Sequence, residues 1–267
     1  MTAGALGGRI GAGTLLTLLV VFLVAPILVV VLMSFTNQLY LAFPPTKLVW
    51  RWYIALWNEP DWLTAAANSI VIGVATAAVS MLLGTLSALA ITRGGRGWMQ
   101  PVASLIVAPM MLPHIIIAIG LYPTMLDLGL NSTYSAVVIG HAVVATPLVF
   151  TTVTAALRGY DPALEMAAMT LGANGWRSFR YVTLPMIGSG LAIGGIFAFA
   201  ASFDELMLAL FLASPRTETL PRLLWEHLNQ TITPVIAAVA TIILIFSLAL
   251  LGVVALLRRP EAEEAAS

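Results

Sequence analysis

The stretch that decides the fold, DPALEMAAMTLGANGWRSFRYVTLP, runs from Asp161 to Pro185 between two long apolar runs. Asp161 suits a helix N-cap, and Pro162 suits the first helical position, where its missing N–H leaves no bond unmade. Gly172 can end that helix in the left-handed conformation, and Asn174 with the following glycine is typical of a turn. The sequence therefore predicts two short helices joined by a turn, in a polar loop between membrane spans.

The first of these helices carries one apolar face of small residues. Its apolar positions follow the i, i+3, i+4, i+7 spacing of a helix, at Leu164, Ala167, Ala168 and Leu171. The second short segment is expected from Trp176 to Tyr181. We expect this face to dock on another protein; an ordinary amphipathic loop between two spans is the alternative.

The register of the loop resembles the EAA loop of the inner-membrane permease subunits of ABC importers. The family pattern is Glu-Ala-Ala, three residues, glycine, nine residues, an aliphatic residue, one residue and Leu-Pro. The matching positions here are Ala167, Ala168, Gly172, Val182, Leu184 and Pro185. Met166 stands at the family's glutamate position, and Glu165 lies one residue earlier. The resemblance implies an ATPase-coupling loop made by Glu165, Met166, Ala167, Ala168, Gly172, Leu184 and Pro185.

The resemblance extends over residues 64–257. Ser202-Phe203-Asp204-Glu205 and the later Pro215-Arg216-Thr217 look most like the polyamine (spermidine/putrescine) branch. The family implies an all-α membrane protein with six transmembrane helices, the type I ABC importer permease fold. We expect residues 1–63 to form a tail, a first span and an outer aromatic loop, residues 64–257 the permease domain, and residues 258–267 a cytoplasmic tail.

The composition is that of a membrane protein. Hydrophobic residues make up 60% of the 267 residues and charged residues 9%, which excludes an ordinary soluble domain. The net charge is zero, so nothing in the charge favours binding of nucleic acid. The chain has no cysteine, which excludes disulfides, thiolate catalysis and zinc sites of the cysteine type.

Six apolar runs are long enough to cross a bilayer, and they cover residues 15–33, 65–91, 101–122, 134–157, 187–212 and 234–257. The first is interpreted as a retained span because it is longer than the apolar core of a signal peptide. Pro109 and Pro113 should break the third span. Gly190 and Gly194 should let the fifth pack closely against a neighbour. The aromatic residues between 36 and 62 are typical of the headgroup layer, with a surface helix near 48–57.

The basic residues set the orientation. If the N-terminus is inside, the inner face holds eight of them and the outer face four, which favours this orientation. The inner set is Arg9, Arg93, Arg96, Arg158, Arg177, Arg180, Arg258 and Arg259; the outer set is Lys47, Arg51, Arg216 and Arg222. We therefore expect a multi-pass protein of the bacterial inner membrane, with both termini and the 161–185 loop in the cytoplasm.

The chain carries no nucleotide-binding loop of its own. Its only lysine, Lys47, lacks the glycine-rich setting of a P-loop, so ATP would have to bind to another polypeptide. The resemblance implies a homologous permease partner, two ATP-binding subunits and an external solute-binding protein around this chain, in membrane lipid. It implies no cofactor in the chain itself.

Charged and polar groups in the spans are candidates for a substrate pathway: Asp204, Glu205, His114 and His141. Counted at ~1.5 Å per residue from residue 187, Asp204 lies roughly 25 Å along the fifth span, in its outer third. No Lys or Arg is expected at that depth. We expect Asp204 to attract a cationic substrate, with His114 or His141 as a neighbour, and only one of the two adjacent carboxylates to face the pathway. The alternative is that both are shallow and meet headgroups or the binding protein.

Other function classes are less well supported. The histidines have no metal-ligand spacing, and Ser189 lacks the glycine that precedes a nucleophile elbow, so neither a metal site nor an intramembrane esterase is expected. An ion-coupled secondary transporter or a channel subunit is the alternative function, although no inverted repeat is visible.

Overall fold

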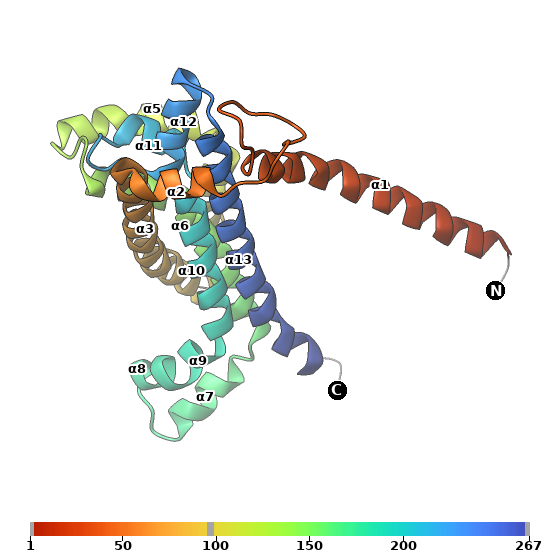
Figure 1. The fold of residues 1–267 in the computed structure, drawn as a ribbon. Helices are drawn as coiled ribbons and strands as arrows, with labels where there is room; N and C mark the ends of the chain where they lie inside the picture. The colour runs from red at the N-terminus through yellow and green to blue at the C-terminus, as the bar shows by residue number, and fades with distance from the viewer. Residues whose placement is uncertain (1–2, 95–98, 265–267) are drawn as a thin grey trace. The chain divides into compact units, whose positions relative to one another are not determined.

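The computed structural model describes residues 3–94 and 99–264, with side chains from 13 to 94 and from 99 to 257. This part of the chain is helical apart from its connections and one isolated antiparallel bridge between Thr36 and Leu48. The helices (Figure 1) are α1 (Ala3–Met33), α2 (Arg51–Asn58), α3 (Pro60–Arg93), α4 (Met99–Val107), η1 (Ala108–Met111), α5 (His114–Asp127), α6 (Tyr134–Gly159), α7 (Ala163–Thr170), α8 (Gly175–Ser178), η2 (Phe179–Thr183), α9 (Leu184–Met186), α10 (Gly188–Phe203), α11 (Met207–Leu212), α12 (Leu220–Gln230) and α13 (Pro234–Glu264). The predicted all-α class is confirmed.

Within the described residues, four helices are each long and apolar enough to cross a membrane. They are Gly13–Met33, Pro60–Arg93, Tyr134–Gly159 and Pro234–Leu257. Two bent pairs pass the same test: Met99–Met111 with His114–Asp127, bent by 105°, and Gly175–Met186 with Gly188–Phe203, bent by 69°. Six spans result if each bent pair is counted as one.

The bends and ends correct several predicted boundaries. The break in the third span lies where Pro109 and Pro113 predicted it, because proline removes a backbone donor. The fifth span is not continuous to residue 212, because α10 ends at Phe203 and α11 begins at Met207. The structure also contains more helix than predicted. The segment between the fifth and sixth predicted spans, residues 213–233, contains α12, and α1 and α13 extend into the predicted tails. Residues 95–98, which include the predicted inner-face residue Arg96, lie outside the described residues.

The chain divides into two compact units, residues up to 63 with 224–246 and residues 64–223 with those from 247 on. In the first unit, the rings of Phe35, Trp50 and Tyr53 lie 4.9 to 5.4 Å apart. The region predicted near 48–57 contains a helix, α2. The headgroup interpretation fails for two of the tryptophans, since Trp52 is 7% and Trp62 1% exposed.

Those two tryptophans are held inside the first unit by polar contacts. The Trp52 indole donates to the Thr36 carbonyl at 2.6 Å. The Trp62 indole donates to Glu59 at 3.0 Å, and its ring lies 4.8 Å from that of His227. A buried indole N–H needs a hydrogen-bond partner, so the two rings serve as core residues of this unit.

The second unit is built on α6 and α10, which pack along most of their length. The helices meet at glycines: a Cβ on Gly190 would lie 2.5 Å from the Ala156 side chain, and one on Gly194 would lie 2.5 Å from Thr152. The predicted close packing at these two glycines is confirmed. Buried aliphatic residues of α3 and α6, including Ala88, Val149 and Val153, surround this contact, which forms the core of the unit.

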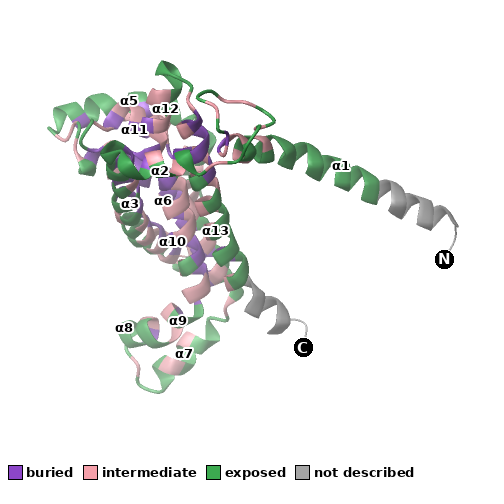
Figure 2. Ribbon diagram, viewed as in Figure 1, coloured by how far each residue is buried: buried purple, intermediate pink, exposed green. Residues whose placement is uncertain are grey.

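The second unit has two distinct ends. Figure 1 shows α7, α8 and α9 at one end of α6 and α10, with α5 and α11 at the other. In Figure 2 the α7–α9 end is mostly exposed, whereas buried residues follow α6 and α10. The predicted coupling loop and the predicted pathway carboxylates therefore lie at opposite ends of the same pair of helices.

Candidate functional site: the α7–α9 loop and the break between α10 and α11

The first helix of the loop has the ends that its sequence predicts. The Asp161 carboxylate accepts a hydrogen bond from the Ala163 N–H at 2.9 Å, and the helix begins at Ala163, one residue later than expected. Gly172 has φ +93°, a conformation that a residue with a Cβ rarely adopts. Its N–H donates to the Met169 carbonyl and the next N–H to the Ala168 carbonyl, each at 3.0 Å. These paired bonds are a Schellman helix end.

The second helix of the loop is longer than predicted. Asn174 is its N-cap, because its side-chain oxygen accepts from the Arg177 N–H at 2.9 Å. The helix continues from α8 through a π-helical turn, η2, into α9, and this 175–186 segment meets α10 at a bend of 69°. Such π turns are uncommon and recur at functional positions.

Large apolar side chains are exposed over the loop. Met166 is 59% exposed, and Leu171 is 90% exposed. Ala167 is exposed and Ala168 half-buried. Further exposed residues of this kind are Leu164, Met169, Trp176, Tyr181 and Met186. A set of exposed apolar side chains on one short loop indicates an interaction surface.

Glu165 lies on a different side of the same helix and faces into the unit. Its carboxylate forms an ion pair with Arg93, the last residue of α3, and accepts a hydrogen bond from the Thr183 hydroxyl. The Arg93 guanidinium also donates to that hydroxyl at 3.1 Å. Thr183 is fully buried in η2, and the Glu165 side chain is 18% exposed. The cluster joins three helical elements.

The environment of Glu165 keeps it ionised. Burial alone would raise the pKa of this carboxyl, but the hydrogen bond from Thr183 and the charge of Arg93 outweigh burial and lower the pKa below its usual value. Burial, with Glu165 as its neighbour, raises the pKa of the Tyr160 phenol, so that group keeps its proton. The carboxylate is therefore charged at neutral pH.

At the other end of the unit, the Glu205 side chain is bonded to groups within the chain. One carboxylate oxygen lies 2.6 Å from His114 Nδ1 at the start of α5, and the other accepts from the Leu208 N–H at 3.0 Å. The residue is 5% exposed. Glu205 therefore caps the first turn of α11 and joins it to α5, which explains why the helix breaks here.

Asp204, in contrast, is exposed. Both of its oxygens lie 3.4 Å from the Ser247 hydroxyl of α13. No described Lys, Arg or His forms an ion pair with it. Because the helix ends at Phe203, the two carboxylates diverge through a change of backbone direction and not through helical periodicity.

The histidines are placed differently from the prediction. His114 is the neighbour of Glu205 and not of Asp204. His141 is completely buried, and its Nδ1 lies 2.8 Å from the Ser202 hydroxyl. Among the described residues, no three His, Asp or Glu side chains are grouped so that they could hold a metal ion.

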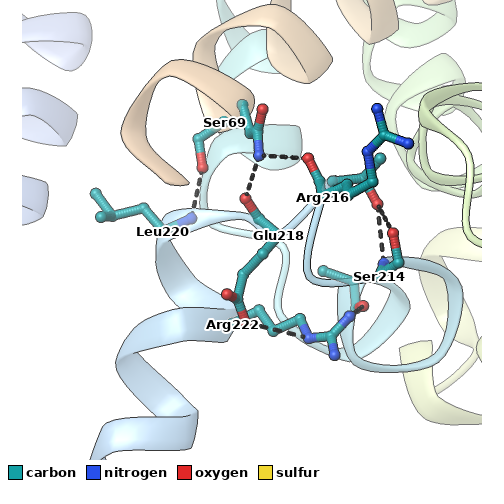
Figure 3. Close-up of polar contacts among 9 residues, drawn as sticks. Ser69, Ser214, Arg216, Glu218, Leu220 and Arg222 are labelled. Atoms are coloured by element: carbon teal, nitrogen blue, oxygen red, sulfur yellow. Dashed lines mark hydrogen bonds and ion pairs between the residues drawn. The ribbon is translucent and has the colours of Figure 1, made fainter. Parts of the chain in front are cut away.

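The segment between α11 and α12 is fastened to α3 and α6. The Asn68 amide donates to the carbonyls of Arg216 and Glu218, at 3.2 and 2.9 Å, and accepts from the Tyr134 hydroxyl at 2.6 Å. Figure 3 shows the Leu220 N–H bonded to Ser69, at 2.8 Å. The Pro215-Arg216-Thr217 segment is thus held rigidly by its backbone, which leaves the exposed Arg216 side chain facing outward.

Sequence reasoning missed Arg93, Thr183 and Tyr160 as partners of the loop, and Ser247 and Ser202 as partners of the pathway candidates. The Arg93–Glu165 contact spans 72 residues and the His114–Glu205 contact 91. No local pattern could pair them. The one available signal was that an arginine at a span end and an acid in the adjoining loop were both assigned to the inner face.

Comparison with known proteins agrees with this geometry. Residues 80–260 match the family described as the binding-protein-dependent transport system inner membrane component. The chain belongs to this family. As a member, it is a membrane component of a transport system and not an enzyme.

Two relatives are similar over most of their length. The spermidine/putrescine transport system permease protein PotC of Escherichia coli (strain K12) is 29% identical over 241 residues, which cover 90% of this chain and 91% of that protein. The putrescine transport system permease protein PotI of the same strain is 31% identical over 235 residues, 84% of this chain and 82% of that one.

Solved structures of ABC transporters share the fold. A chain of a bacterial transporter that imports the acidic polysaccharide alginate aligns with a TM-score of 0.77 at 18% identity, over 95% of this chain and 97% of that one. A chain of the MetNI methionine transporter aligns with a TM-score of 0.58 at 18% identity, over 78% and 97%. The predicted type I importer permease fold is confirmed.

Proposed function

We propose that this chain is the permease subunit of an ATP-driven importer of a small cationic amine of the polyamine type. Two of its relatives are named as permease proteins for putrescine or for spermidine and putrescine. The observation that carries the substrate proposal is the exposed Asp204 carboxylate, which no described basic side chain neutralises. A charged carboxylate in or near a membrane calls for a partner, and a cationic amine supplies one.

The α7–α9 loop is the proposed binding site for an ATPase subunit. The exposed residues Met166 and Ala167, with the half-buried Ala168, would enter a cleft of that subunit, and Gly172, Leu184 and Pro185 would hold the loop in shape. Support comes from the apolar exposure of this loop in a chain with no nucleotide-binding loop of its own. ATP would then bind to the partner, and this chain would need no cofactor.

The complete transporter would also contain a second permease of similar fold, two ATPase subunits and an external binding protein. The family description, which names dependence on a binding protein, supports the last of these. A further similar structure is that of the alginate transporter in complex with a periplasmic protein that holds an alginate pentasaccharide. Residues 64–257 would form the permease domain of this assembly.

The proposed orientation places both termini and the α7–α9 loop in the cytoplasm of a bacterial cell, with the protein in the inner membrane. The excess of basic residues on that face supports it. The α10–α11 break, at the opposite end of the unit from the loop, would then face the external binding protein.

The test is transport by the purified complete complex in lipid vesicles. We expect ATP-dependent accumulation of labelled putrescine or spermidine, and none of a neutral sugar of similar size. A non-hydrolysable ATP analogue should abolish the signal. Accumulation of the sugar in place of either amine would overturn the substrate proposal and leave the permease assignment standing.

A further inference from the structure

Glu165 has contacts that point inward, although it lies in the loop proposed to bind the ATPase. Its carboxylate binds Arg93 of α3 and Thr183 of η2, and only 18% of its side chain is exposed. Met166, the next residue, is 59% exposed. Adjacent positions on a helix diverge by ~100°, so α7 presents Met166 outward and Glu165 inward.

The inward contacts are the polar connection between α7 and the rest of the unit. Among the described side chains of α7, no other forms a hydrogen bond or ion pair beyond the helix and its cap. Thr183 precedes α9, which leads into α10, and Arg93 ends α3. Glu165 therefore joins α7 to the end of α3 and to η2, the turn that leads through α9 into α10.

The chemistry of the cluster suits a firm connection. One carboxylate oxygen takes both the guanidinium and the hydroxyl, and the guanidinium also bonds the hydroxyl at 3.1 Å, so the three groups close a triangle. Hydrogen bonds to ionised groups are stronger than those between neutral groups. Thr183 is fully buried and the Glu165 side chain is 18% exposed, whereas the Arg93 side chain is 45% exposed, so the hydroxyl and the carboxylate are shielded from water more than the guanidinium.

We infer that Glu165 is a positioning residue that acts within this chain, where the Arg93–Glu165–Thr183 triangle transmits displacement of α7 to α3 and α10. The inference rests on the proposed docking of an ATPase on α7. It assigns Glu165 a task different from that of a residue that binds the ATPase. In this inference the triangle transmits the displacement of α7, and the exposed apolar face of α7 binds the ATPase subunit.

The test separates attachment from transmission in the purified complete complex. Co-purification of the ATPase subunit measures attachment, and stimulation of ATP hydrolysis by the loaded binding protein measures transmission. In Glu165→Gln and in Arg93→Gln we expect co-purification to be retained and stimulation to fall by about tenfold, the loss expected for a hydrogen bond between charged groups. Thr183→Val should lower stimulation less, and Thr183→Ser, which keeps the hydroxyl, should not change it.

The charge-exchanged pair Arg93→Glu with Glu165→Arg supplies the decisive comparison. We expect it to recover part of the stimulation that each single exchange loses, since the two groups would again attract each other. Loss of the ATPase subunit in Glu165→Gln, with Arg93→Gln unaffected and no recovery in the pair, would overturn the inference and show that Glu165 binds the ATPase. If bulky changes on the exposed face of α7 also leave co-purification intact, the proposed docking fails instead.

Discussion

The two ends of the second unit both interrupt helices, and both carry acidic side chains, but they use them differently. At the α7–α9 end the acid, Glu165, is satisfied within the chain, and apolar side chains remain exposed. At the α10–α11 end Glu205 is satisfied within the chain, and the acid Asp204 remains exposed. These exposed groups are the basis of the two partners proposed above: an apolar protein surface at one end and a cation at the other.

The largest effect is expected from blocking the apolar end. Ala168→Trp should abolish co-purification of the ATPase subunit, because a large ring replaces a small side chain in the proposed contact. Since Ala168 is half-buried, Ala167→Trp, at an exposed position, is the companion variant and should act in the same direction. If both variants keep the ATPase subunit, this end does not take a protein.

A smaller but still large effect is expected from distorting the end of α7. Gly172→Val should uncouple transport from ATP hydrolysis, because a β-branched residue at φ +93° forces the Schellman turn to change shape. Gly175→Val is the matched control, since Gly175 has no positive φ and no atom within 4 Å of an added Cβ. Stimulation of the ATPase by loaded binding protein is the measurement. Equal stimulation in the two variants would show that the turn geometry is irrelevant.

At the acidic end, Asp204→Asn should lower uptake of a cationic amine by about tenfold, the scale of one interaction between charged groups. Co-purification of the subunits should not change, because among the described residues the Asp204 carboxylate forms no ion pair and its side-chain partner is the Ser247 hydroxyl at 3.4 Å. Asp127→Asn removes an exposed carboxylate at the end of α5 and should have no effect on uptake. Normal uptake in the Asp204 variant, with the amine confirmed as substrate, would leave this end without a proposed ligand.

The smallest effect on transport is expected from Glu205→Gln, which should act on stability. The amide keeps the shape of the side chain but loses the charge that faces His114 and the Leu208 N–H of α11. The free energy of unfolding should therefore fall by about 1–3 kcal/mol, which is measured as a lower thermal midpoint of the complex. Preference for cationic over neutral solutes should stay as it is. A changed preference with an unchanged midpoint would show that Glu205, and not Asp204, meets the substrate.

The two ends also differ in how well the sequence predicts them. The loop is set by local chemistry: a carboxylate cap at Asp161, a left-handed glycine at 172 and an amide cap at Asn174, each of which acts within a few residues. The α10–α11 break has no glycine or proline to announce it, and the apolar run continues through it. Glu205, beside the break, contacts His114, which lies 91 residues away in the chain. Local signals therefore located one end, whereas the other end contains a long-range contact that no local pattern predicts.

The same limit applies to single residues of the candidate site. Glu165 was expected as a coupling residue from its place in the loop, but its inward direction depends on Arg93, and the sequence does not show that the two meet. Asp204 was expected beside a histidine on a continuous helix. In the structure the helix breaks after Phe203, and His114 contacts Glu205, the residue next to Asp204.

The glycine contact between α6 and α10 has a mechanical consequence. Gly190 and Gly194 leave no space for even a methyl group against Ala156 and Thr152, so α6 and α10 are in close contact there. The α7–α9 loop joins the end of α6 to the start of α10, and the far end of α10 is the break after Phe203, where Asp204 is exposed. On the proposed function, displacement of the loop would therefore reach the exposed carboxylate through one tightly packed pair of helices.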